Sequence, residues 1–495
     1  MGDQRRMEQN LELTRSIQLV SDFRRDLLNT PATNVDLLEQ EARIQEIANS
    51  IGRGMMSEVF AHADVKAPEV SVNGVRWGNR RELETTYTTK FGDVRTSRGV
   101  YQHSGGGPVM VPLEVRLGIV EGRYTPAVAR VMTRARASLP AAEAEALLKE
   151  AGVAMVSTST LHRVPKALAA RYETMRQQIN EQLRETEVVP DEAVTVQVAL
   201  DGVMVPQDGE LAKPRGRKTD SPKAPRHETR YGPVNAHGPA NDDGEAGRSW
   251  HEGSVGTIAY FDKDGERLRT VYLARMPESK MATLTDDLEQ ELSHVLAQRP
   301  DLDICFASDG DHYQWEVLEG MALRLPRTAL GLVLYMLDFF HAAEYLTEAA
   351  ELVYGTDSPD AHATAAEWRE TLKRAEDGAD RVLKSLRYHR DQLPKGKKRE
   401  SMQTIIDYLA SNRKAGRLDY AHARDLNKPI GTGIVEAAAK TVVNVPMKRA
   451  GARFDQHGGQ TVMTFRAAVL SDRFERLSAV LERSYRATVS VPHAA

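Results

Sequence analysis

The chain has 495 residues, a formal net charge of −4, 41% hydrophobic residues and 27% charged residues. This length exceeds one ordinary core and predicts about three or four structural units. The single cysteine, Cys305, excludes an intramolecular disulfide and a multi-cysteine zinc site. Because the net charge is slightly negative, any nucleic-acid surface must be a local patch. The first residues lack an apolar signal core and no run of about 18 apolar residues occurs, so we expect a cytoplasmic protein without a membrane span.

The region up to residue 115 changes character once. Residues 1–63 have a helical period, whereas residues 70–115 alternate in polarity and contain β-branched residues and turns. We therefore predict that residues 1–115 form an N-terminal helical segment followed by a small β unit.

Residues 116–188 are predicted to form a helix-turn-helix DNA-binding region. Thr125 and Pro126 begin a helix, a second helix ends at Gly152, and a segment rich in Ser and Thr opens the next helix. In a helix-turn-helix the second helix enters the major groove of DNA. A plain helical bundle explains the spacing equally well, so that alternative stays open.

From residue 191 the predicted order is strand, strand, strand, helix, strand, helix, strand and then helices. This is the order of a ribonuclease-H-like domain. We predict a multidomain α+β protein whose ribonuclease-H-like α/β catalytic domain comprises residues 189–344 and 429–495, the latter including basic C-terminal helices. A long all-helical insertion, residues 345–428, separates the two parts.

Three acidic residues stand at informative places in this order. Asp201 and Asp309 each follow an apolar strand and precede a glycine, and Glu436 opens a helix after Gly-Thr-Gly. Adjacent strand ends bring the two aspartates side by side. Carboxylates suit Mg²⁺ or Mn²⁺, and two such ions about 4 Å apart serve phosphoryl transfer. An Asp-Gly pair alone is more often a simple turn, but the joint placement in strand order predicts a catalytic and metal-binding triad.

Other residues are predicted to support this triad or to bind DNA. Asp338 and His341 share a helical face. They either support the active site or contact DNA, or they are a helix cap and a buried histidine; the sequence favours neither interpretation. Lys440 lies one helical turn after Glu436. The predicted phosphate-binding residues are Lys448, Arg449, Arg453, Arg466, Arg217 and Lys218. The alternatives are a solvated basic face for the C-terminal group and a disordered excursion for the loop of residues 213–230, which contains Arg217 and Lys218.

The segment from Asp201 to about Arg476 resembles the catalytic domain of bacterial DDE insertion-sequence transposases, in particular the ISKra-type group related to mutator-like elements. The matching pieces are Asp201-Gly202, Trp250 to Thr257 with Phe261-Asp262, Ser308-Asp309-Gly310 with Trp315, Leu337 to Leu346, Pro429 to Lys440, Lys448 to Phe454, and Phe465-Arg466-Ala467. The Asp-Phe-Phe-His and Gly-Thr-Gly-Ile-Val-Glu pieces are together quite specific.

This resemblance implies a DNA transposase of the bacterial cytosol and nucleoid. It implies that the enzyme cleaves insertion-sequence ends and joins their 3′-hydroxyls to target DNA, using two Mg²⁺ or Mn²⁺ ions held by Asp201, Asp309 and Glu436. The implied partners are double-stranded DNA, comprising terminal inverted repeats and target, and further copies of the chain, as a homodimer or larger assembly on DNA.

The chain departs from the family pattern in three places. It lacks the cysteine-bearing segment of the N-terminal region, it has Asn444 to Met447 where a basic residue is usual, and it has Phe454 where Trp is usual. Two alternatives follow: a domesticated or inactivated transposase that only binds DNA, and a ribonuclease-H-like nuclease that acts on other nucleic-acid structures. The long N-terminal region disfavours the latter.

Overall fold

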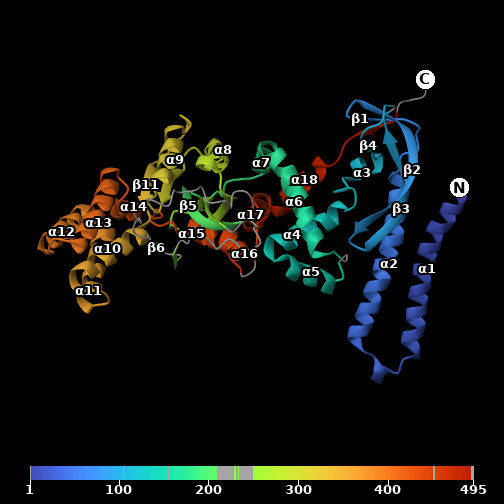
Figure 1. Cartoon of the computed structure of the whole chain (residues 1–495), viewed down its shortest axis with the longest axis horizontal. Coiled ribbons are helices and arrows are strands. Elements are labelled where there is room, and N and C mark those ends of the chain that lie inside the picture. The colour runs from blue at the N-terminus through green and yellow to red at the C-terminus, as the bar shows by residue number, and fades with distance from the viewer. Residues whose placement is uncertain are drawn as a thin grey trace, which may run out of the picture. The chain divides into compact units, whose positions relative to one another are not determined.

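The computed structural model describes residues 2–103, 105–153, 156–208, 228–229, 232–233, 249–449 and 452–491. The chain divides into two compact units, residues 1–183 with 473–495, and residues 184–472. Each unit combines helices with a β-sheet, so the predicted multidomain α+β class is confirmed (Figure 1). The sequence-based prediction assigned residues 429–495 to the catalytic domain. Contacts in the structure instead group residues 473–495 with the N-terminal region. None of the described helices has the length and apolar character that crossing a membrane requires.

The first unit begins with two long helices and a small sheet. The helices are α1 (Gly2–Asn29) and α2 (Leu37–Ala63), joined through η1 (Ala32–Asn34). The sheet has the order β12-β1-β2-β3-β4, with strands β1 (Val70–Val72), β2 (Val75–Thr89), β3 (Gly92–Gln102), β4 (Val109–Met110) and β12 (Val489–Ser490). Strands therefore occupy the segment where the sequence predicted a β unit. The edge strand β12 comes from the far end of the chain.

Helices complete the first unit. They are α3 (Pro112–Leu117), α4 (Pro126–Ser138), α5 (Ala141–Glu150), α6 (Thr158–Thr174), α7 (Arg176–Glu185) and α18 (Phe474–Ser484). The three helices α4, α5 and α6 pack against one another, and α18 packs on α4 and α6.

The second unit is built on a mixed sheet of order β11-β10-β5-β8-β9. Its strands are β5 (Thr195–Gln207), β8 (Ser249–Phe261), β9 (Arg267–Arg275), β10 (Asp303–Ser308) and β11 (Val333–Leu337). The first three are antiparallel, and β10 and β11 run parallel to β5. A separate short pair consists of β6 (Glu228–Thr229) and β7 (Gly232–Pro233).

The central strand β5 is buried on both faces because its apolar side chains alternate between two cores. Val196, Val198 and Leu200 pack with α8 (Ala282–Gln298) and α9 (His312–Leu323), while Ala199 and Val203 pack with the helices that follow β11. A strand buried on both faces reads as a continuous apolar run. This explains why the segment Val194 to Leu200 was recognisable as a strand.

Helices dominate the rest of the second unit. Five of them cover the predicted insertion: α10 (Phe339–Tyr354), α11 (Pro359–Arg374), α12 (Gly378–Gln392), α13 (Lys397–Lys414) and α14 (Tyr420–Asp425). The remaining helical elements are α15 (Gly433–Ala438), the π-helical turn η4 (Ala439–Asn444), α16 (Val445–Met447), α17 (Gln456–Leu470) and the 3₁₀ turn η3 (Ser279–Met281).

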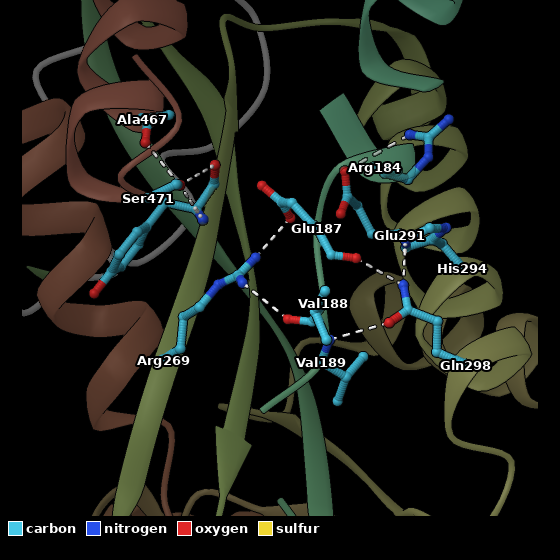
Figure 2. Close-up of polar contacts among 11 residues, drawn as sticks. Arg184, Glu187, Val188, Val189, Arg269, Glu291, His294, Gln298, Ala467 and Ser471 are labelled. Atoms are coloured by element: carbon cyan, nitrogen blue, oxygen red, sulfur yellow. Dashed lines mark hydrogen bonds and ion pairs between the residues drawn. The ribbon is translucent and has the colours of Figure 1, made fainter. Parts of the chain in front are cut away.

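Polar contacts fix the segment that leads into β5 (Figure 2). Glu187 accepts a hydrogen bond from Arg269 of β9 at 2.6 Å. Gln298 of α8 donates to the Glu187 carbonyl at 2.8 Å and accepts from the Val189 amide at 3.1 Å. The buried backbone of this segment therefore has partners on both α8 and β9. These contacts set the position from which β5 starts.

Candidate active site

The strand β5 carries Asp201 at its middle, which corrects the sequence-based expectation that a strand ends there. Residues 202–207 continue the ladder with β8, from Gly202 opposite Ser254 to Gln207 opposite Ser249. On the other side of β5 the ladder with β10 stops at the pair Ala307 and Ala199. Asp201 therefore lies just beyond the point where β5 and β10 cease to pair, and Asp309 follows the end of β10.

The pKa of Asp201 is affected by the other two predicted acids, which connects all three in one site. Burial and the negative charges of Asp309, Glu436 and Glu252 together raise the pKa of Asp201 to about 7. The Gly202 amide opposes this shift by donating to the carboxylate. A carboxyl group disfavours ionisation when it is dehydrated and when like charges lie close to it. Perturbation of this kind is typical of functional sites.

A short loop before α15 positions Glu436 at the site. The Gly431 carbonyl accepts from Gln197 of β5 at 3.1 Å, and the Thr432 carbonyl accepts from the Glu436 amide at 3.0 Å. Buried Asp338 accepts from the Thr432 amide at 3.3 Å and from the Thr432 hydroxyl. The loop before α15 is therefore tied to β5 and to the start of α10, which fixes where Glu436 begins its helix.

Asp338 has two contacts in the structure: it caps a helix, and it also holds the loop before Glu436. One carboxylate oxygen caps α10 by accepting from the Phe340 amide at 2.7 Å, and the other holds Thr432. Its predicted neighbour His341 has its ring 5.1 Å from that of Tyr345 and 6.3 Å from that of Tyr408. His341 thus belongs to an aromatic cluster on α10 and α13.

That aromatic cluster reaches the backbone at Asp309. The Tyr408 hydroxyl donates to the Asp309 carbonyl at 2.9 Å. Gly310 has a φ of 108°, and a Cβ at this position would lie 2.1 Å from the Tyr408 hydroxyl. Glycine is therefore required at 310 both for its backbone conformation and for this close approach. Through Tyr408 the helical insertion helps to hold the second predicted acid.

Glu252 of β8 is a fourth acid that the sequence-based prediction missed. Its side chain is exposed, and partial loss of hydration together with Asp311 and Asp309 raises its pKa. A Cβ added to Gly202 would lie 2.0 Å from Glu252 Oε1, so this carboxylate crosses the strand next to Asp201. Glu252 is the one acidic residue within the sequence of β8, and this is the signal that points to it.

Gln314 is a second residue that the prediction missed. It is buried on α9, and its amide bridges the two strands where their ladder has ended. The amide nitrogen donates to the Leu200 carbonyl at 3.0 Å and to the Ser308 hydroxyl at 2.7 Å, and the amide oxygen accepts from the Gly202 amide at 3.2 Å. These partners flank Asp201 and precede Asp309. Gln314 therefore sets the spacing between the two acids.

Gln314→Leu is expected to lower the unfolding free energy by about 2 kcal/mol, because it leaves buried backbone groups without partners. If the two acids act together, it also lowers their joint activity by about a hundredfold, since small displacements of reacting groups are costly. Urea denaturation measures the first effect, and the rate of the reaction that these acids catalyse measures the second.

Gln298→Leu is the matched control, because Gln298 also bridges two backbone groups in this unit, at Glu187 and Val189. The Gln298→Leu variant should have a lower unfolding free energy than wild type. Its activity, and the dependence of that activity on pH, should be those of wild type. Equal loss of activity in both variants would assign Gln314 a purely structural role.

The predicted DNA-binding residues have different surroundings. Lys440 and Arg449 are exposed, and Lys448 Nζ lies 5.8 Å from the centre of the Trp250 ring. Arg453 forms an ion pair with Asp208 at 3.1 Å. Arg466 donates to the Thr441 carbonyl, and burial lowers its pKa. Arg466 therefore braces the turn after Glu436. Arg217 and Lys218 lie outside the described residues.

The donor set suits a hard divalent cation. The carboxylates of Asp201, Asp309, Glu436 and Glu252 supply only oxygen ligands, and their mutual repulsion is relieved by positive charge. Among the described residues no group of three or more acidic, histidine or cysteine side chains is arranged so that it could hold a metal ion. The four acids therefore form an open group, on β5, β8, α15 and the turn after β10.

No family model matches the chain, and no curated protein matches it significantly. The function must therefore be argued from the site itself.

Proposed function

We propose that the chain is a DNA transposase, which cleaves the ends of its insertion sequence and joins the freed 3′-hydroxyls to target DNA. The observation that carries this proposal is the placement of the acids where β5 and β10 stop pairing. Asp201 lies just beyond the last pair, Asp309 follows β10, and the loop before Glu436 is bonded to Gln197 of β5. The raised pKa of Asp201, whose causes include the charges of Asp309 and Glu436, supports this placement. These three acids are separated by long stretches of chain, yet they act on one another. The same acids carry the resemblance to DDE transposases.

The sheet supports a ribonuclease-H-like fold for this catalytic domain. The first long strand, β5, is central, with the next two strands antiparallel on one side and β10 and β11 parallel on the other. The first acid lies on the first strand, the second follows the fourth, and the third lies on a later helix. Fold alone does not determine function, so the proposal depends on the acids rather than on the sheet.

Each residue has a defined part in the proposed reaction. Asp201, Asp309 and Glu436 would hold two Mg²⁺ or Mn²⁺ ions, which when bound activate the attacking hydroxyl and stabilise the leaving oxygen. Gln314 and the Asp338–Thr432 contact keep the three carboxylates in register. Lys440 and Arg449 are exposed after Glu436 and suit contacts with DNA phosphates.

The proposed partners are double-stranded DNA, as terminal repeats and target, and a second copy of the chain. Two element ends must be brought together before joining, which requires at least two active sites. Residues 116–188 are proposed to bind the repeats.

An inactivated transposase that retains only DNA binding is the second candidate. The observation in its favour is that predicted phosphate-binding side chains have partners within the protein, namely Arg453 with Asp208 and Arg466 with the Thr441 carbonyl. Such residues must be released before they bind DNA.

Strand cleavage distinguishes the two candidates. The protein is incubated with Mg²⁺ or Mn²⁺ and a duplex that carries the end of its own element, and nicked and joined products are resolved on denaturing gels. We expect 3′ nicking and joining by wild type, and at least a thousandfold less by Asp309→Asn and Glu436→Gln. Glu316→Gln, an exposed acid on α9, is the control and should keep wild-type rates. Binding without cleavage by wild type would favour the inactivated protein.

A further inference from the structure

A strongly basic stretch surrounds the loop between α12 and α13. Residues 381–399 contain eight lysines or arginines and one acid, Asp391, in a chain whose net charge is −4. None of these basic residues belongs to the DNA-binding set that the sequence predicted. The stretch is therefore a separate concentration of positive charge, and its use depends on how many of these charges already have partners.

The acids near this stretch are mostly bound by arginines. Asp391 accepts from Arg390 at 2.8 Å and from Arg399 at 3.1 Å. The acids at the start of α12 are paired in the same way, Asp377 with Arg381 and Asp380 with Arg413. Glu400, the next acid along the chain, is exposed after the stretch. These arginines are therefore used within the protein, and the lysines remain.

Four lysines of the stretch keep their charge available. Lys384, Lys395, Lys397 and Lys398 are exposed, and within the part of the chain that the structure describes none of them forms an ion pair or a side-chain hydrogen bond. Lys384 lies on the outer face of α12, and the other three lie in the loop and the first turn of α13. These four residues, called the lysine patch below, therefore present positive charge that the fold does not neutralise.

Packing fixes the backbone on both sides of the loop that carries the lysine patch. Leu386 of α12 and Met402 of α13 are buried in one core, and Leu393 of the loop packs against it. Arg390 donates to Gln403 at 2.6 Å, which joins the two helices where they lie side by side (Figure 1). The patch is thus a preformed surface with flexible lysine side chains. Such a surface suits a partner that is recognised by charge.

The helix α13 connects the lysine patch to the candidate active site. It begins at Lys397, and Tyr408 on the same helix donates to the Asp309 carbonyl at 2.9 Å. From Lys397 to Tyr408 the helix rises by about 16 Å, and duplex DNA advances by about 3.4 Å per base pair, so this length corresponds to about five base pairs. A duplex whose reacting phosphate lies at the acids can therefore reach the patch.

We propose that the lysine patch binds the phosphate backbone of duplex DNA, without preference for sequence, about five base pairs from the bond that is cut. This inference rests on the proposed function in taking DNA as the partner. Lysine ammonium groups act towards phosphates as point charges, and phosphate contacts carry no information about base sequence. The patch therefore holds flanking DNA beside the active site and leaves the choice of sequence to other parts of the chain.

Binding to two duplexes of unrelated sequence, measured in EDTA over a range of salt concentrations, tests this proposal. The patch variant combines Lys384→Gln, Lys395→Gln, Lys397→Gln and Lys398→Gln, and thermal melts verify that the full-length variant is folded. The logarithm of the affinity falls with the logarithm of the salt concentration, with a slope of about −0.9 for each phosphate neutralised. The slope of the patch variant should be smaller in magnitude by about 3 to 4, and its affinity for both duplexes should fall by about tenfold or more at moderate salt.

The matched control makes the same change in net charge at four exposed basic residues outside the patch, with Lys263→Gln, Arg267→Gln, Arg327→Gln and Lys414→Gln. It should keep the wild-type slope, as should a variant with arginine at all four patch positions, because arginine retains the charge. The proposal is overturned if the patch variant and the control have the same slope, or if the patch variant weakens binding to only one of the two duplexes.

Cleavage in Mg²⁺ tests the position of the patch. On duplexes that extend well beyond about five base pairs from the bond that is cut, the patch variant should cleave more slowly than wild type at limiting protein; on shorter duplexes the two rates should be equal. Equal rates at every length would overturn the position. A slope that depends on the patch in a protein that never cuts DNA would overturn the proposed function and leave the patch as a DNA-binding site.

Discussion

Asp201→Asn is expected to abolish strand cleavage and, in the absence of metal, to make the folded protein more stable. The ordinary pKa of this carboxyl is 3.8, and in the fold it is about 7, first because Asp201 is buried and then because Asp309 and Glu436 are close. At neutral pH and above, the fold must therefore accommodate a charge that it disfavours. Asparagine keeps the size of the side chain and removes the charge.

The unfolding free energy depends on pH because the folded and unfolded chains differ in whether Asp201 is protonated. As the pH rises from 3.8 to about 7, the folded protein keeps a proton on Asp201 that the unfolded chain has already released. The unfolding free energy of wild type therefore falls through this window, by on the order of 4 kcal/mol when it is complete. This contribution is absent from Asp201→Asn.

Urea denaturation in EDTA, from about two pH units below the pKa of Asp201 to about one unit above it, measures this difference. Wild type should lose stability relative to Asp201→Asn as the pH rises, and Glu316→Gln should follow wild type. Isothermal titration with Mn²⁺ should show tighter binding to wild type than to Asp201→Asn. If Asp201→Asn is less stable than wild type at pH 8, the carboxylate stabilises the fold. The idea that this acid destabilises the fold for the sake of catalysis would then be wrong.

The acids were predictable because each one interrupts an apolar pattern. Asp309 ends a run that only a buried strand explains, and the Gly-Thr-Gly before Glu436 marks the start of a helix. Strand order then placed Asp201 and Asp309 on neighbouring strands of one sheet, with Glu436 on a later helix. The full extent of β5 was not predicted, because an Asp-Gly pair suggests a turn, whereas Gly202 and the residues up to Gln207 continue the pairing with β8.

The residues that the prediction missed depend on pairing between distant segments. Glu252 reaches the site only because β8 pairs with β5 in the register that puts Glu252 opposite Met204. The bridge made by Gln314 needs an edge of β5 that β10 leaves open. Likewise, Ser490 bonds to the Ser71 carbonyl across 419 positions. Local patterns contain no information about such partners.

Asp338→Ala is expected to lower the unfolding free energy by about 3 kcal/mol, which combines loss of a helix cap with loss of acceptors for buried donors. Asp338 is 1% exposed, and its carboxylate holds the Phe340 amide at the start of α10 and Thr432 before α15. The Phe339 amide also donates to the Ile430 carbonyl at 3.0 Å, so the loop and α10 are fixed together. Without Asp338 the loop that carries Glu436 loses its attachment.

Activity is therefore expected to fall more than stability alone explains. Ser358→Ala is the matched control, because Ser358 caps α11 by accepting from the Ala361 amide at 3.1 Å and lies away from the acids in sequence. It should cost about 1 kcal/mol and leave cleavage unchanged. Thr432→Val keeps the cap of α10 but removes the hydroxyl that donates a hydrogen bond to Asp338. It should therefore slow cleavage with a smaller loss of stability than Asp338→Ala.

Cleavage rates measured with all protein folded, at urea-free conditions and saturating Mg²⁺, separate these effects. If Asp338→Ala cleaves DNA as fast as Ser358→Ala, Asp338 is a helix cap and nothing more, and Glu436 is positioned by Gln197 and its own helix. If Thr432→Val alone slows cleavage, the contact between Asp338 and Thr432 positions Glu436. That result would connect a residue at the start of α10 to the third acid through a single buried hydrogen-bonded pair.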